Sequence, residues 1–165
     1  MKTYYIILFL LLLQIGHVSS QDPVKDSLYR VLQNALDDSA KYKVQTLLTD
    51  FYIEKDRDSS IFFSNKCIDL ANRNHKYLDV ASSLSNKGHA SANNNEKSKE
   101  LLLSAKDIAE KNRFLKNLGY INLDLGQRYL DQGIIDTALI MEREAMQLLT
   151  DAGEIKALGY CNMLI

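Results

Sequence analysis

Apolar residues recur at helical spacing along most of the chain, and short polar breaks separate the groups. From residue 22 to 36 they return every three or four positions, which predicts one amphipathic helix with Pro23 in its first turn. Asp37-Asp38-Ser39 then ends this helix and can cap the next. The same spacing predicts helices over residues 40–54, 59–73, 77–90 and 97–111, and two more within 114–152 on either side of a break at 131–133.

The predicted helices pair into hairpins that share a register. Small residues recur at two places in the second helices: Cys67, Ala105 and Ala145 at one, and Ser60, Ser98 and Ala138 seven residues before them. Small side chains there let two helices cross closely. Helical hairpins that recur every 34–45 residues or so are typical of an α-solenoid. We therefore predict an all-α fold: an N-terminal helix in residues 21–39, then an array over 40–165 with hairpins at about 40–73, 76–111 and 114–152 and the start of a fourth at 154–165.

The first twenty residues follow a different pattern. Lys2 precedes the apolar run from Tyr4 to Leu13, and the small residues Val18-Ser19-Ser20 come before Gln21. This pattern predicts a secretory signal peptide over residues 1–20, and hence an exported, periplasmic or otherwise extracytoplasmic protein. An uncleaved membrane anchor is the alternative, although the run is about half the ~20 apolar residues that span a bilayer.

Composition and charge add little to this interpretation. Hydrophobic residues make up 46% of the 165 and charged residues 25%, with one proline and no tryptophan, which suits a helical globular chain. The net charge is −1 and the isoelectric point is near 6.3, so nothing favours binding to nucleic acid.

No motif in the sequence indicates catalysis or a cofactor. His75 and His89 have no carboxylate or cysteine cluster at metal-ligand spacing, and Cys67 and Cys161 suit core positions better than a disulfide. A calcium loop starting at Asp56 would need glycine where Ile61 stands. We expect no enzyme activity, no metal and no cofactor.

The third hairpin carries Gly126, Tyr129, Gly133, Ala138 and Ala145 at the spacing of the tetratricopeptide repeat. The chain from about Ala40 to Ile165 resembles this family. The resemblance and the shared register together imply a set of repeat-packing residues: Ser60, Cys67, Ser98, Ala105, Gly126, Tyr129, Ala138 and Ala145.

In this family the first helix of each hairpin lines a concave groove that holds an extended peptide or a partner helix. The resemblance therefore implies a protein or peptide partner and these groove residues: Tyr42, Gln45, Thr49 and Tyr52 from the first hairpin, Ser82, Ser85 and His89 from the second, and Tyr120, Leu123, Gln127 and Leu130 from the third. Aromatic and amide side chains suit peptide recognition because they combine contact area with hydrogen bonds.

Two further expectations concern the role of the chain. More narrowly, it resembles the exported input region of bacterial histidine kinases or helix-turn-helix regulators, which implies either a self-standing interaction module or the sensor part of a larger signalling protein, with a membrane span and an output domain further on. The apolar residues 155–165 predict self-association through the C-terminal hairpin, since an uncovered apolar end of an array promotes association.

Overall fold

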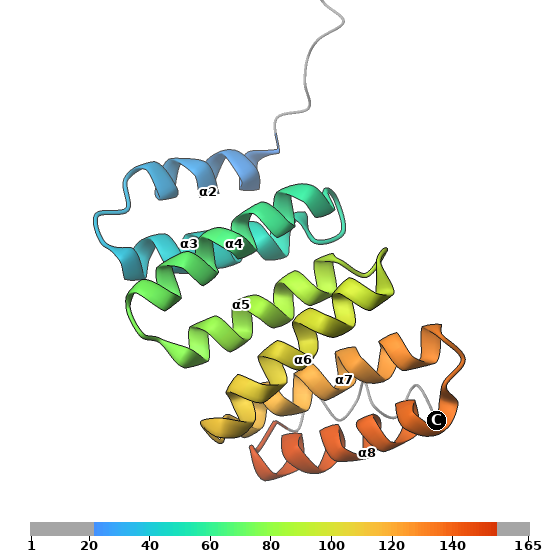
Figure 1. The fold of residues 1–165 in the computed structure, drawn as a ribbon. Helices are drawn as coiled ribbons and strands as arrows, with labels where there is room; N and C mark the ends of the chain where they lie inside the picture. The colour runs from blue at the N-terminus through green and yellow to red at the C-terminus, as the bar shows by residue number, and fades with distance from the viewer. Residues whose placement is uncertain (1–21, 155–165) are drawn as a thin grey trace, which may run out of the picture.

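The computed structural model describes residues 22–154, and all regular secondary structure in that range is helical, which confirms the predicted all-α class. The helices follow one another in pairs after a single N-terminal helix (Figure 1). Their bounds are α2 Pro23–Gln33, α3 Asp38–Tyr52, α4 Arg57–Arg73, α5 Tyr77–Ala90, α6 Asn95–Lys111, α7 Leu115–Asp131 and α8 Ile135–Asp151. The predicted signal peptide and the predicted fourth hairpin, apart from its first residue, lie outside the described residues. No helix within 22–154 combines the length and apolarity needed to cross a membrane.

Side-chain caps fix where four of these helices begin. Asp22, Asp37, Asp56 and Asn94 precede α2, α3, α4 and α6, and each accepts a hydrogen bond from a backbone N–H of the first turn. Such a cap satisfies a donor that the helix itself leaves free. Because of these caps, α3, α4 and α6 each begin two residues before the predicted start.

The same type of turn ends the second helix of each hairpin. His75 and Arg113 have positive φ angles of 52° and 57°, and Gly153 has a φ of 74°. After each of them a backbone N–H donates to the carbonyl five residues back, as Lys76 does to Ala71 at 2.9 Å and Phe114 to Ala109 at 2.9 Å. This is the left-handed helix end that glycine adopts most easily. Its recurrence at 38 and then 40 residues matches the spacing of the small residues in the second helices.

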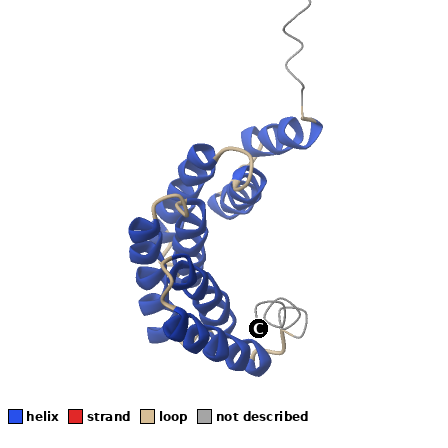
Figure 2. Ribbon diagram, turned by 90° about the vertical axis from the view of Figure 1, so that its right-hand side faces the viewer, coloured by secondary structure: helices blue, strands red, loops and turns tan. Residues whose placement is uncertain are grey.

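The hairpins α3–α4, α5–α6 and α7–α8 stack along a curved path that is open on one side (Figure 2). The backbones of α3 and α5 approach one another, as do those of α5 and α7. Among the described helices, α4 and α6 do not approach one another in this way, and neither do α6 and α8. The first helices therefore line the inner side of the curve. The described part of the chain has a helical-repeat-like architecture.

Small residues lie where the two helices of a hairpin cross. Ser60, Ser98, Ala138, Cys67, Ala105 and Ala145 are all buried, with at most 2% of each exposed. Ser60 Oγ donates to the Thr49 carbonyl at 3.0 Å, and Ser98 Oγ donates to the Gly88 carbonyl at 2.7 Å. Gly126 is also buried, while Tyr129 is half-buried with the Lys99 ammonium 5.6 Å from the centre of its ring.

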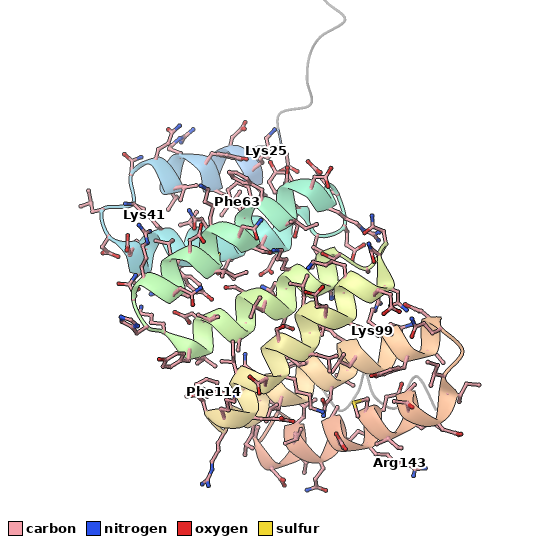
Figure 3. All side chains as sticks on the ribbon, viewed as in Figure 1. Lys25, Lys41, Phe63, Lys99, Phe114 and Arg143 are labelled. Carbon is pink, nitrogen blue, oxygen red and sulfur yellow. The ribbon has the colours of Figure 1, made fainter. Side chains whose placement is uncertain are left out.

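Helix α2 covers part of the first hairpin. Leu28 and Leu32 pack on a small core of Val44, Leu48 and Phe63, the last of which is labelled in Figure 3. A larger core joins α5, α6 and α7 through Leu102, Ile121 and Leu125, among others.

Candidate functional site

The inner side of the curve contains a hollow between α5 and α7, with a volume of about 370 Å³. Its lining comes from these two first helices alone: Ser82, Ser85, Asn86, His89, Asn117, Tyr120, Ile121, Leu123 and Asp124. We refer to it as the α5–α7 hollow. Five of the eleven groove residues inferred from the sequence meet here, namely Ser82, Ser85, His89, Tyr120 and Leu123.

An ionic contact joins the two walls of the α5–α7 hollow. His89 Nδ1 lies 3.4 Å from Asp124 Oδ1, and Ser85 Oγ donates to Asp124 Oδ2 at 3.4 Å. The hydrogen bond and negative charge of Asp124 raise the pKa of His89 above its ordinary value, against the opposing effects of burial and of Arg128. The carboxylate of Asp124 therefore stabilises the protonated form of His89 relative to a free histidine.

Uncharged polar groups form the rest of the contact between α5 and α7. Asn117 Nδ2 donates to Ser82 Oγ at 2.7 Å. Tyr120 is exposed, and its hydroxyl donates to Glu154 Oε2 at 3.5 Å. The same carboxylate group receives Lys116 Nζ on its other oxygen, and this contact lowers the pKa of Glu154. The hollow thus offers hydroxyl, amide and aromatic groups at its surface.

The grouping of Ser85, His89 and Asp124 does not form a nucleophilic triad. Asp124 lies between the other two, and among the hydrogen bonds of residues 22–154 none joins Ser85 to His89. A serine nucleophile needs the histidine beside its hydroxyl to remove the proton. The described residues also contain no group of three His, Cys, Asp or Glu side chains placed to hold a metal ion. The arrangement suits recognition by hydrogen bonds and contact area.

The groove residues inferred for the first hairpin lie outside this hollow, and for Thr49 the inference is wrong. Thr49 is only 1% exposed, so a partner cannot reach it. Tyr52 stacks on Phe63 with ring centres 5.9 Å apart and shares a hydrogen bond with the Tyr29 hydroxyl at 3.3 Å. Burial, followed by that bond, raises the pKa of Tyr52 to about 12. Tyr52 is therefore partly buried and packs against the small core beneath α2.

Tyr42 and Gln45 are also outside the α5–α7 hollow. The Tyr42 hydroxyl donates to the Asp79 carbonyl at 3.1 Å and lies 3.2 Å from Ser83 Oγ, so it fastens α3 to α5. Gln45 lines a different hollow, of about 600 Å³, between α3 and α4. In the third hairpin Gln127 is bonded to Asp131 and Leu130 is exposed, and neither lines the α5–α7 hollow.

A shift of one residue explains the first-hairpin error. Ser60 bonds to the Thr49 carbonyl as Ser98 bonds to that of Gly88, so Thr49 is the equivalent of Gly88 and Asp50 is the equivalent of His89. Thr49 and Gly88 are buried, and Asp50 and His89 are exposed. One residue turns a helix by about 100°. Asp50 therefore occupies the place on the inner face of α3 to which the sequence analysis assigned Thr49.

Sequence reasoning also missed Asn86, Asn117 and Asp124. Asn117 and Asp124 are three residues before and four residues after Tyr120, which is the spacing of one helix face. That spacing could have identified both once Tyr120 was assigned to the groove.

Compared with known proteins, the chain matches no family model and shows no significant similarity to a curated protein.

Proposed function

We propose that the chain is an exported, non-catalytic interaction module, an α-solenoid of tetratricopeptide-like hairpins that binds a peptide or protein segment along its inner side. The observation that carries this proposal is the α5–α7 hollow, which is open, lies between two consecutive first helices and is lined by hydroxyl, amide and aromatic groups. Side chains of this kind give a bound peptide hydrogen bonds together with contact area.

The test is selection from a displayed peptide library against the purified chain, followed by binding measurements on variants. Tyr120→Ala and Leu123→Ala each remove a large side chain that lines the α5–α7 hollow and should each weaken a selected peptide by about tenfold or more. Leu103→Ala is the matched control, because Leu103 is 48% exposed on α6, outside the hollow. Equal losses in all three variants, or no enrichment of any peptide, would reject the proposal.

A further inference from the structure

A second hollow, on a different face of the chain, has features of a small-molecule site. It lies between α6, α7 and α8, has a volume of about 300 Å³, and is lined by Lys106, Glu110, Leu118, Asn122, Glu144, Gln147 and Leu148. We refer to it as the α6–α8 hollow. None of these residues lines the α5–α7 hollow, so the two sites can be tested separately.

Asn122 is the unusual residue of the α6–α8 hollow. It is 1% exposed, and its Nδ2 donates to Glu144 Oε2 at 3.2 Å. A carboxylate only accepts hydrogen bonds, so this contact fixes which end of the amide faces Glu144. The other end, Oδ1, is buried without a hydrogen-bond partner. A buried acceptor left in this state costs stability, and a donor placed beside it would recover that cost.

Lys106 is also incompletely paired. Its Nζ lies 3.7 Å from Glu144 Oε2 and 3.8 Å from Glu110 Oε1, and within residues 22–154 it makes no hydrogen bond. Its side chain is 19% exposed, so water reaches it only in part. The hollow therefore combines an ammonium that has two carboxylates nearby but no hydrogen bond, a buried amide oxygen that lacks a donor, and apolar walls from Leu118 and Leu148.

The preceding hairpin provides a comparison within the molecule. The second helices repeat at 38 and then 40 residues, as Cys67, Ala105 and Ala145 do, so the equivalents of Lys106 and Glu144 are Ile68 and Ser104. The first helices α5 and α7 repeat at 38 residues, as Gly88 and Gly126 do, so the equivalent of Asn122 is Leu84. Leu84 packs against the large core. Packing of the repeat therefore does not require a polar group at the position of Asn122. The fold already accepts leucine at the equivalent position.

We propose that the α6–α8 hollow binds a small zwitterion, an α-amino acid with an apolar side chain. Its ammonium donates to Asn122 Oδ1 beside the Glu144 carboxylate, its carboxylate accepts from Lys106, and its side chain lies against Leu118 and Leu148. Lys106 and Asn122 each gain a hydrogen bond, and because Asn122 Oδ1 is buried, its amide must turn toward the hollow to accept one. A simple amine would leave Lys106 with only its two ion pairs, and a simple acid would leave Asn122 without a donor.

The probes are L-leucine, isoamylamine, which lacks the carboxylate, and isocaproate, which lacks the ammonium. Titrating the full chain with leucine should raise its Tm in a saturable way, because a ligand that binds only the folded state stabilises it. Each partial probe should bind about tenfold or more weakly, since it forfeits a charge-assisted hydrogen bond. The side-chain amide signal of Asn122 in an NMR spectrum should shift with leucine.

Asn122→Leu is the decisive variant, because it restores the residue found at Leu84. It should raise the Tm of the unliganded chain and abolish the leucine effect, while Ser85→Ala in the α5–α7 hollow should leave the leucine effect unchanged. No saturable effect of leucine, an equal effect in Asn122→Leu, or isoamylamine binding as tightly as leucine would each overturn the proposal.

Discussion

The first and third hairpins bring their helices together by different chemistry. In α3–α4 a serine hydroxyl bridges the crossing, from Ser60 to the Thr49 carbonyl, and Cys67 fills the second small position. In α7–α8 the corresponding places hold Ala138 and Ala145, which cannot form such a bridge, and the two helices approach most closely at another point, where Gly119 faces Leu149. The second hairpin combines both, with Ser98 bonded to the Gly88 carbonyl and Gly88 pressed against Leu102.

The difference shows that one repeat position can be stabilised in two ways. A serine bridge gives a directional hydrogen bond at a fixed helix separation, whereas glycine and alanine let the helices come closer and gain packing. The first hairpin should therefore respond to loss of a hydroxyl, and the third to added volume. Four predictions test this contrast, ordered by the size of the expected effect.

Ala145→Leu should be the most destabilising change. Ala145 is fully buried at the crossing of α7 and α8, so three extra carbons have no space there. We expect a loss of about 3 kcal/mol in the free energy of unfolding, measured by urea denaturation. Arg143→Ala, two residues away on the exposed face, should change it by less than about 0.5 kcal/mol. Similar losses in both variants would contradict the assigned crossing.

Gly119→Ala should cost about 1–2 kcal/mol, although alanine is the better helix former. A Cβ at this position would lie 2.5 Å from Leu149 Cγ, and Leu149 is itself fully buried and cannot move aside freely. Gly126→Ala is the matched control in the same helix, where the nearest atom would lie at an ordinary 3.4 Å. That variant should be more stable than the parent by about 0.5–1 kcal/mol. Melts of the two variants should shift in opposite directions.

Ser60→Ala should cost about 1 kcal/mol through loss of the bond to the Thr49 carbonyl. The change removes one oxygen and leaves the packing volume nearly intact, so the loss reports the hydrogen bond. Ser104→Ala is the comparison, because Ser104 bonds to the carbonyl of Glu100 on an exposed face. It should change stability by less than about 0.5 kcal/mol. If Ser60→Ala is neutral, the serine bridge does not stabilise the first hairpin.

The smallest expected effect distinguishes two of the polar contacts between hairpins. Tyr42 joins α3 to α5 through neutral hydrogen bonds, and burial raises its pKa above the ordinary 10, so this contact should not titrate near neutral pH. His89 joins α5 to α7 through Asp124, with Arg128 and Glu54 nearby. Its raised pKa means that its stabilisation is complete below the unfolded pKa of about 6.5 and is lost as pH rises through the folded value.

Urea melts at about pH 5.5 and about pH 8.5 measure this contribution. Because His89 is half exposed, solvent screening limits the pH-dependent contribution to a few tenths of a kcal/mol. The parent chain should lose that amount relative to His89→Gln as pH rises, while Tyr42→Phe should lose stability equally at both pH values. A difference of the opposite sign would show that His89 is held neutral.

The sequence alone determined the helices and the positions at which they cross. Apolar periodicity located every helix between residues 22 and 154, and the shared register identified Ser60, Ser98 and Ala145 as small positions that prove to be buried. These features are local or repeat at a fixed interval, so pattern counting finds them. The exact first residues of α4 and α6 follow from the capping residues Asp56 and Asn94, which can be recognised in the sequence once the helices are known.

Only the tertiary structure decided how each helix is rotated and which side chains meet. Thr49 and Asp50 are equally plausible groove residues from periodicity, and the contact with Ser60 assigns Thr49 to the interior. The resemblance placed Gly126 among the repeat-packing residues, but the helices approach more tightly at Gly119, which faces Leu149. The unpartnered oxygen of Asn122 has no signature in the chain. Rotation, approach and hydrogen-bond satisfaction depend on neighbours distant in sequence, and periodicity within one helix carries no record of them.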